Sequence, residues 1–205
     1  MLIKAKEKKE RALGTKLGLK GERCNSPKCA MIRRPYGPGM HGKRRRRAPS
    51  EFGEQLKEKQ KIRFSYALKE GQLGRIFAEA AKKTEATGDA LMRLLESRLD
   101  NVVFRLGFAG SRLVARQLVN HGHILVNGRV SNTPSRRVRI GDVISLSERA
   151  KKSVFASELP ARLKKYNAPS WLGLDKEKIE GKMSGSPVDV ERPFDVDKVI
   201  DYYSR

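Results

Sequence analysis

The chain has 205 residues, of which 45 are Lys or Arg and 23 are Asp or Glu, so its formal net charge is +22 and its pI is near 10.3. A free globular protein gains no stability from such self-repulsion, and the excess indicates a polyanionic partner, with nucleic acid as the first candidate. No apolar run approaches the roughly 20 residues of a membrane span, and the charged N-terminus lacks the apolar segment of a secretory signal. The composition therefore argues against membrane and secreted proteins.

The positive charge lies mainly in two parts of the chain. Residues 1–47 carry a net charge of +13 and residues 98–165 a net charge of +10, whereas residues 48–97 and 166–205 are close to neutral, at +1 and −2. This distribution predicts two basic surfaces for a polyanion and two segments that pack against the rest of the protein.

The first basic segment is rich in Pro and Gly over residues 33–42 and continues into a run of cations over residues 43–47. Pro and Gly at this density prevent a helix or a central strand, so we expect an irregular basic arm that can follow a phosphate backbone. Tyr36 and His41 favour this interpretation, because planar groups among cations can stack on unpaired bases. The alternative is a disordered tail that only keeps the protein soluble.

Residues 50–83 are predicted to form two helices. In the second half, Gly71 and Gly74 indicate a break, and apolar residues then follow the spacing of an amphipathic helix, at Leu73, Ile76, Phe77, Ala80 and Ala81. The first half carries four cations spaced by two, namely Lys57, Lys59, Lys61 and Arg63. Residues two apart point around a helix, so only some of these cations can contact a polyanion at once.

The segment from Asp89 to Gly107 is predicted to form one long helix. Asp89 can cap it, Gly107 can end it, and the apolar residues between them repeat at helical spacing: Leu91, Leu94, Leu95, Leu99, Val102, Val103 and Leu106.

A second helix is expected from Arg112 to His121, capped by Ser111 and closed by Gly122. Its apolar stripe contains Val114, Ala115, Leu118 and Val119. Arg112 and Arg116 lie one turn apart on the opposite face. The N-terminus of this helix suits a phosphate group, because the backbone dipole and the arginine charges both favour an anion there.

A hairpin follows over residues 124–130, in which Asn127-Gly128 is the strongest short signal for a type I′ turn. Further strands fit Val138–Ile140 and Val143–Leu146, joined by a turn at Gly141-Asp142. These elements predict a module of two helices packed on a small, largely antiparallel sheet, and an α+β fold for the chain.

Several strings in this module resemble the RNA-binding domain named after bacterial ribosomal protein S4. They are Arg98-Leu99-Asp100-Asn101-Val102-Val103, Arg105-Leu106-Gly107-Phe108, Ser111-Arg112, Ala115-Arg116-Gln117-Leu118-Val119, His121-Gly122-His123-Ile124, Val126-Asn127-Gly128 and Gly141-Asp142. Strings outside the module resemble the same family: Gly21-Glu22-Arg23-Cys24, Arg34-Pro35-Tyr36-Gly37-Pro38-Gly39 with His41-Gly42, Glu58-Lys59-Gln60-Lys61 and Tyr202-Tyr203-Ser204-Arg205. The resemblance to the bacterial small-subunit ribosomal protein S4 family thus covers most of the chain from residue 20 onward.

The resemblance implies a mostly helical domain into which the RNA-binding module is inserted. The implied regions are a basic N-terminal arm over 1–47, a helical domain over 48–97 that is completed by 166–205, and the module over 98–165. The family implies a non-enzymatic protein of the cytoplasmic ribosome that binds 16S rRNA directly and nucleates assembly of the subunit body. It also implies a contribution to translational accuracy with neighbouring small-subunit ribosomal proteins, and neither a membrane nor a small-molecule substrate as partner.

The residues predicted to contact RNA come from the arm, the first helix of the helical domain and the module. They are Arg44, Arg45, Arg46 and Arg47; Lys57, Lys59, Lys61 and Arg63; and Arg98, Ser111, Arg112, Arg116, Gln117, His121, Asn127, Gly128 and Arg129. Arg112 and Arg116 are expected to make the most specific contact. The alternative is that these two arginines are solvated or pair with Asp100 or Glu96.

Some family members hold zinc with four cysteines, and Cys24 and Cys29 match the second pair of that set. At the position of the first pair this chain has Glu7-Lys8-Lys9-Glu10. A structural zinc site needs four N or S ligands, and two thiols with a distant His41 fall short. We therefore expect two reduced cysteines, no metal and no other cofactor.

Two other functions are compatible with the module alone. Pseudouridine synthases that carry the same domain use an aspartate in a motif similar to Arg98-Leu99-Asp100, but here Asp100 lies in the predicted apolar-striped helix and no second domain is left to form a pocket. An accessory factor that acts on ribosomal particles would also use such a module, and the basic arm and the family-like C-terminus argue against it.

Overall fold

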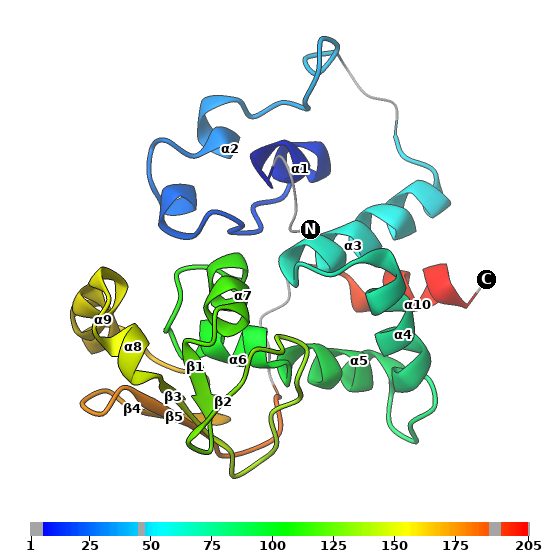
Figure 1. The fold of residues 1–205 in the computed structure, drawn as a ribbon. Helices are drawn as coiled ribbons and strands as arrows, with labels where there is room; N and C mark the ends of the chain where they lie inside the picture. Colours follow the sequence, from blue (N-terminus) through cyan, green and yellow to red (C-terminus); the bar gives the residue numbers. More distant parts are fainter. Residues whose placement is uncertain (1–5, 45–47, 189–193, 205) are drawn as a thin grey trace. The chain divides into compact units, whose positions relative to one another are not determined.

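The computed structural model describes residues 6–44, 48–188 and 194–204 (Figure 1). The chain divides into two compact units, one formed by Met1–Leu91 with Glu191–Arg205 and the other by Met92–Val190. We call them the helical unit and the sheet unit, and describe each by itself. Among the described residues, no helix has both the length and the apolar character needed to cross a membrane.

The N-terminal part of the helical unit contains helices where the sequence predicted an irregular arm. These are α1 (Lys6–Leu13), the 3₁₀ helix η1 (Gly21–Asn25) and α2 (Ala30–Arg33). The Pro- and Gly-rich stretch over residues 34–44 has neither helix nor strand, as expected.

Two charged side chains hold this N-terminal part together. The Glu10 carboxylate, 1% exposed, accepts hydrogen bonds from the backbone N–H groups of Leu17 and Leu19 at 3.0 and 3.2 Å. The Arg11 guanidinium donates to three carbonyl groups of the following stretch, those of Arg34, Tyr36 and Gly37. Charged groups fix the chain here, so the sequence contains no apolar periodicity from which these helices could be predicted. The prediction of an irregular arm was therefore wrong for residues 6–33.

The two central helices agree with the prediction. α3 (Glu51–Ser65) begins after Ser50, whose hydroxyl accepts a hydrogen bond from the N–H of Gly53 at 3.2 Å. α4 (Glu70–Ala80) buries Leu73, Ile76 and Ala80 of the predicted stripe.

The break between α3 and α4 lies earlier than predicted. Gly71 and Gly74 are inside α4, and the chain turns instead at Ala67, which adopts a left-handed backbone conformation with φ of 53°. A non-glycine residue in this conformation leaves no signal in the sequence.

α10 (Val196–Tyr203) completes the helical unit by packing along α3. Asp195 caps it by accepting hydrogen bonds from the N–H groups of Asp197 and Lys198. Its two tyrosines stack on aromatic rings, Tyr202 on Phe52 at a centroid distance of 5.7 Å and Tyr203 on Phe77 at 4.5 Å. Aromatic pairs of this kind add to the energy gained from apolar burial.

The long helix predicted from Asp89 to Gly107 is two helices, so that prediction was wrong. α5 (Thr87–Glu96) is separated from α6 (Leu99–Arg105) by a break at Ser97 and Arg98. At the break the N–H of Leu99 donates to the carbonyl of Arg136, and the carbonyl of Ser97 accepts from the N–H of Val138, both at 2.8 Å. Hydrogen bonds to a segment far along the chain replace those of the helix, and local spacing does not contain that information.

The loop that forms these hydrogen bonds with the helix break was predicted to contain a strand at Val138–Ile140. The structure has no strand at these residues. The loop pairs with the helix break through a single bridge between Arg98 and Arg137. A strand needs a partner of its own length, and here the partner is only the break between two helices.

The described residues of the sheet unit form a five-stranded antiparallel sheet in the order β2-β1-β3-β5-β4. Its strands are β1 (Ile124–Val126), β2 (Arg129–Val130), β3 (Val143–Leu146), β4 (Leu172–Asp175) and β5 (Glu180–Met183). β1 and β2 form the predicted hairpin, in which Asn127 and Gly128 have the positive φ values, 52° and 76°, of a type I′ turn.

β4 and β5 were not predicted, and they change the limits of the regions. β5 pairs with β3 in a register that places Gly181 opposite Ile144, so residues 172–183 extend the sheet. The resemblance had assigned the whole of 166–205 to the helical domain. In the structure only the last part, Glu191–Arg205, falls in the helical unit.

Three further helices follow α6 in the sheet unit: α7 (Arg112–Asn120), α8 (Glu148–Lys151) and α9 (Val154–Lys164). α7 starts as predicted, because the Ser111 hydroxyl accepts a hydrogen bond from the N–H of Val114 at 3.3 Å. Ala115 and Val119 of its predicted stripe are buried, whereas Val114 is 39% exposed.

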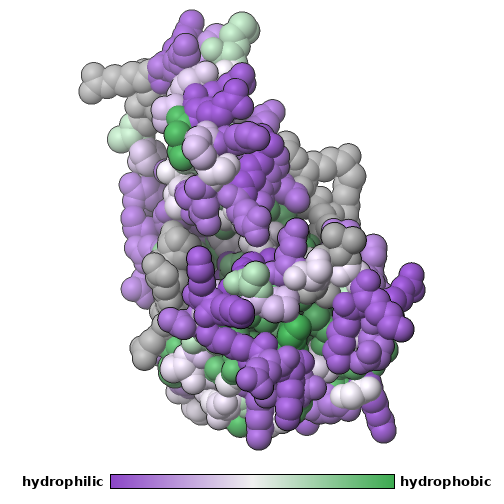
Figure 2. Space-filling model, turned by 90° about the vertical axis from the view of Figure 1, so that its left-hand side faces the viewer, coloured by the Kyte–Doolittle hydropathy of each residue, from purple (hydrophilic) through white to green (hydrophobic). Residues whose placement is uncertain are grey.

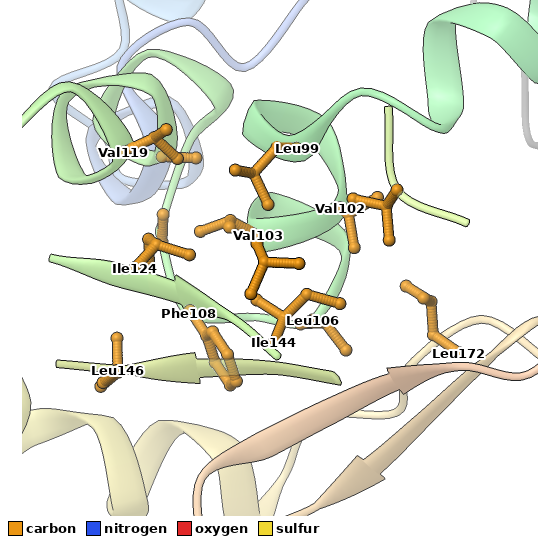
Figure 3. Close-up of a cluster of buried hydrophobic side chains, with 14 of the residues drawn as sticks. Leu99, Val102, Val103, Leu106, Phe108, Val119, Ile124, Ile144, Leu146 and Leu172 are labelled. Atoms are coloured by element: carbon orange, nitrogen blue, oxygen red, sulfur yellow. The ribbon is translucent and has the colours of Figure 1, made fainter. Parts of the chain in front are cut away.

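The core of the sheet unit lies between α6 and the strands. In Figure 3 the side chains of α6 project toward those of β1 and β3, and the fully buried residues include Leu99, Val102, Val103, Leu106, Ile124, Ile144 and Leu146. Full burial of such a side chain contributes about 1.5–3 kcal/mol. Gly181 in β5 leaves room for Leu106, since a Cβ at Gly181 would lie 2.4 Å from both δ carbons of that leucine.

Candidate RNA interface

Hydrophilic side chains cover most of the face of the protein shown in Figure 2, and apolar ones show only in small areas between them. The cations among them differ in what surrounds them. Some are exposed and can reach another molecule, whereas others are held by carboxylates of the protein itself.

A basic hollow of about 660 Å³ lies in the N-terminal part of the helical unit. Its charged lining consists of one acidic and eight basic residues: Lys6, Glu7, Lys8, Arg11, Lys20, Arg23, Lys28, Arg33 and Arg34. We call it the N-terminal basin. Glu7 pairs with Lys20 at 3.2 Å and with Arg23 at 3.0 Å, which leaves a large excess of positive charge around the hollow. Such a concave cationic surface concentrates anions.

RNA contacts were predicted in the arm at residues 44–47, but not at the residues of the basin. They are spread over α1, η1, α2 and the following stretch, so no short run marks them. The high charge of residues 1–47 was the signal that pointed to this region.

Two predicted contacts, Arg44 and Lys57, meet at a smaller hollow of about 280 Å³, which Arg11 and Tyr36 also line. Both Arg44 and Lys57 are exposed. The guanidinium of Arg11 lies over the ring of Tyr36, 5.0 Å from its centroid. Arg45, Arg46 and Arg47 lie outside the described residues.

Lys59 is engaged inside the helical unit. Its side chain is buried, and its Nζ lies 2.6 Å from Oε1 of Glu70 and 3.1 Å from the hydroxyl of Tyr202. Burial opposes the ionisation of Glu70, but the hydrogen bonds from Lys59 and Arg63 hold the pKa of that carboxyl below its usual range. Burial, together with the charge of Glu70, raises the pKa of Tyr203.

The other two cations predicted on α3 also have carboxylate partners. Lys61 Nζ lies 2.6 Å from Glu58, and Arg63 Nη1 lies 2.9 Å from Glu70. Lys57 is therefore the α3 cation best placed for an external partner.

In the sheet unit, Asp100 holds two of the predicted arginines. Its carboxylate, 5% exposed, accepts hydrogen bonds from Nε and Nη2 of Arg98 at 3.1 and 2.9 Å. Nη1 of Arg116 lies 3.7 Å from the same carboxylate. Burial lowers the pKa of Arg116, and Asp100 counteracts this effect.

Glu96 pairs with Arg112, the third of the predicted arginines. Arg105 donates two hydrogen bonds to its fully buried carboxylate, and Nη2 of Arg112 lies 3.6 Å from it. Arg112 Nε also donates to the side-chain oxygen of Asn101 at 2.7 Å, and the guanidinium lies 4.7 Å from the centre of the Phe104 ring.

Arg112 and Arg116 thus have the acidic partners that were expected as the alternative to RNA contact, and Arg98 is also paired with Asp100. Arg98 is 4% exposed and has no surface to offer to another molecule. The side chains of Arg112 and Arg116 keep 18% and 17% of their surface exposed at α7. The hydrogen bond to Asn101 orients the guanidinium of Arg112, and the charge of Asp100 attracts that of Arg116.

The remaining predicted contacts of the sheet unit are Gln117, His121, Asn127, Gly128 and Arg129, and all five are exposed. The Asn127 side chain is nevertheless committed: its amide donates to Asp142 at 2.8 Å and its oxygen accepts from the N–H of Val143 at 2.9 Å. Ser111 is buried, and its hydroxyl caps α7. Ser111 and Asn127 therefore shape the surface from within.

One basic group of the sheet unit was missed. Arg136, Arg137 and Arg139 are exposed on the loop between β2 and β3. Three cations within four residues are visible in the sequence, but the strand predicted at 138–140 would have paired this segment inside the sheet.

The residues present do not fit a zinc ion. Cys24 and Cys29 are buried free thiols, which supply only two of the four ligands that a structural zinc ion needs. Within the described part of the chain no three His, Cys, Asp or Glu side chains gather as a ligand set.

Residues 1–96 match the family model of the ribosomal protein S4/S9 N-terminal domain, and residues 97–144 match that of the S4 domain. The small ribosomal subunit protein uS4 of Thermus thermophilus is 50% identical over 194 residues, which cover 94% of this chain and 93% of that protein. The proteins of the same name from Syntrophomonas wolfei and Natranaerobius thermophilus are each 46% identical over the same shares of both chains.

Proposed function

The chain belongs to the family of small ribosomal subunit protein uS4, and on this premise we propose that it binds 16S rRNA directly and nucleates assembly of the body of the small subunit. As a member of that family it is a structural, non-enzymatic constituent of the small ribosomal subunit. In this proposal its other partners are neighbouring small-subunit ribosomal proteins, with which it contributes to translational accuracy in the cytoplasmic ribosome.

One observation carries the proposal of direct RNA contact: both units expose cations, and in the sheet unit the carboxylates that hold the nearby arginines are buried. Eight basic residues surround a single Glu in the N-terminal basin. In the sheet unit, Glu96 and Asp100 are buried while Arg112 and Arg116 reach the surface. A phosphate backbone is the polyanion that such surfaces bind, through release of its counterions.

The proposed contacts differ from the set predicted from the sequence, because the basic residues of the N-terminal basin are added and several predicted residues are left out. They comprise the N-terminal basin, Arg44 and Lys57 in the helical unit, and Arg112, Arg116, Gln117, His121, Gly128 and Arg129 in the sheet unit. Lys59 and Arg98 are left out because both are buried in ion pairs, and Lys61 and Arg63 are left out because each is paired with a carboxylate. Ser111 and Asn127 contribute by fixing the helix start and the turn.

The enzyme alternative depends on Asp100, and its surroundings argue against it. A catalytic aspartate needs access to a substrate, whereas this carboxylate accepts hydrogen bonds from Nε and Nη2 of Arg98 and lies beside Arg116.

Competition binding tests the proposed function. Full-length protein is bound to labelled 16S rRNA at physiological salt and challenged with unlabelled 16S rRNA or with an equal mass of 23S rRNA. We expect 16S rRNA to compete at least about 100-fold better, within the range that separates specific from non-specific nucleic-acid binding. Equal competition would mean that only bulk charge acts, and the proposal of a specific rRNA site would have to be abandoned.

Sedimentation separates a ribosomal constituent from an accessory factor. A constituent stays at about one copy per small subunit after a high-salt wash, because it is held by many contacts and by the folded rRNA around it. An accessory factor held mainly by phosphate contacts is washed off. The copy number is measured by quantitative mass spectrometry of the washed subunits.

A further inference from the structure

A group of exposed arginines in the sheet unit takes no part in the interface proposed so far. Arg136 and Arg139 lie on the loop over residues 131–142, which joins β2 to β3 and which we call the arginine loop. Both are exposed, and neither guanidinium pairs with a carboxylate among the described residues. An exposed arginine without a carboxylate partner has the full hydrogen-bonding capacity of its guanidinium group available to another molecule.

The arginine loop is held in place although it contains neither helix nor strand. One side is bonded to the break before α6, where backbone N–H groups of Leu99 and Asp100 donate to the carbonyls of Arg136 and Pro134 at 2.8 and 3.1 Å. Val138, in the middle, is 3% exposed and anchors the loop to the core. The positions from which Arg136 and Arg139 extend are therefore fixed before any partner arrives.

Asp142 ties the other end of the loop to the hairpin turn. Its Oδ2 accepts a hydrogen bond from the N–H of Arg139 at 2.8 Å, and its Oδ1 accepts one from the side-chain amide of Asn127, also at 2.8 Å. Asn127 in turn accepts from the N–H of Val143 at 2.9 Å. One carboxylate thus sets the relative position of the turn, where Gly128 and Arg129 lie, and the backbone from which Arg139 extends.

We propose that the arginine loop is an RNA-backbone contact surface of its own, with Arg136 and Arg139 binding phosphates and Asp142 as the positioning residue that aligns the loop with the Asn127-Gly128 turn. The proposal rests on the proposed rRNA-binding function and adds residues and a mechanism to it. Arginine suits the role, because its planar fork binds phosphate through two parallel hydrogen bonds. A loop fixed in advance loses little conformational entropy on binding, and this increases affinity.

The first test removes the two arginines. Arg136→Gln with Arg139→Gln, in the full chain, is compared with Lys176→Gln with Lys178→Gln, which removes the same charge at the turn between β4 and β5 in the same unit. We expect the arginine pair to lose about tenfold or more in affinity for 16S rRNA and to make the log–log salt dependence shallower by about 1.5, which corresponds to two phosphate contacts. The lysine pair should lose less than about threefold and leave the salt slope within about 0.5 of that of the wild type.

The second test uses the sign of the charge at Asp142. Asp142→Ala raises the net charge of +22 by one, so attraction by bulk charge predicts tighter RNA binding. If Asp142 positions the surface, the affinity should instead fall about fivefold, and Asp142→Asn, which keeps one side-chain oxygen as acceptor, should recover part of the loss. Circular dichroism and the thermal midpoint check that both variants are folded. If Asp142→Ala does not fold, Asp142→Asn alone carries the comparison, because it removes the same charge.

Equal losses in the arginine and lysine pairs would overturn the contact surface, and would direct attention to a protein partner for the neighbouring Val130 and Ile140, which are 62% and 64% exposed. Unchanged or tighter binding by the folded Asp142 variants would overturn the positioning role. Failure of the wild-type protein itself to prefer 16S over 23S rRNA would instead count against the proposed function.

Discussion

The fully buried carboxylate of Glu96 accepts two hydrogen bonds from the guanidinium of Arg105, at 2.9 Å from Nε and 3.0 Å from Nη2. Asn101 donates to the same carboxylate at 2.7 Å, and Arg112 lies 3.6 Å from it. Parallel bonds of this type fix both groups, so the end of α5 is joined to α6 and α7 through one acidic side chain.

We expect Glu96→Gln to lower the free energy of unfolding by about 3 kcal/mol, because it removes the charge that compensates a partly buried arginine. Urea unfolding of the free protein measures it. Glu148→Gln is the control, since Glu148 also pairs with a cation but is 79% exposed, and should cause no measurable change. Similar losses in both variants would mean that the burial of the Glu96 pair has no particular weight.

Gly181→Ala should destabilise the sheet unit. The new methyl group would lie 2.4 Å from both δ carbons of Leu106, which is fully buried and has no room to withdraw. Overpacking of this kind costs about 1–3 kcal/mol. Thermal unfolding of Gly181→Ala is compared with that of Gly185→Ala, where the nearest atom, Cβ of Trp171, lies at 3.9 Å. Equal thermal midpoints would contradict the close packing of β5 against α6.

The ion pairs of Glu70 with Lys59 and Arg63 predict that the stability of the protein depends on pH. The pKa of Glu70 is lowered in the folded protein, so its contribution to stability is present above its unfolded pKa and is lost as the pH falls through the lowered folded value. Wild type should therefore exceed Glu70→Gln in unfolding free energy near pH 6, and the difference should shrink below about pH 4.5. Urea unfolding of both proteins between pH 3 and pH 6 measures it, and a difference that grows on acidification would contradict the sign.

Gln117 and His121 test the RNA face of α7 without disturbing the ion pairs of Arg112 and Arg116. Both are exposed, so Gln117→Ala with His121→Ala should leave the thermal midpoint unchanged. We expect affinity for 16S rRNA to fall about fivefold to tenfold through loss of polar contacts. The control is Lys176→Ala with Lys178→Ala, at exposed positions on the β4–β5 turn. Binding that weakens more in the control than at α7 would remove this face from the proposed interface.

The features that the sequence predicted correctly depend on neighbours in the chain. The start of α7 is fixed by the Ser111 hydroxyl three residues before Val114, and the hairpin by the two positive-φ positions Asn127 and Gly128. Both signals are complete within a few residues, so spacing and residue type are sufficient.

The features that were not predicted from the sequence depend on contacts between residues that lie far apart in the chain. The break before α6 is fixed by Arg136 and Val138, and the ordered N-terminal part by the buried carboxylate of Glu10. The partners of Arg112 and Arg116 were foreseen only as an alternative, because the sequence does not show which side of a helix faces Glu96 or Asp100. Charge patterning located the basic regions, and the folded chain determines which cations remain exposed.

The salt dependence of 16S rRNA binding tests the central claim most directly. Affinity is measured by filter binding over a series of potassium chloride concentrations, and the logarithm of the association constant is plotted against that of the salt concentration. Each phosphate contact contributes about −0.7 to −0.9 to the slope. An interface of several exposed cations predicts a slope steeper than about −2, whereas a shallower slope, equivalent to two or three contacts at most, would contradict it.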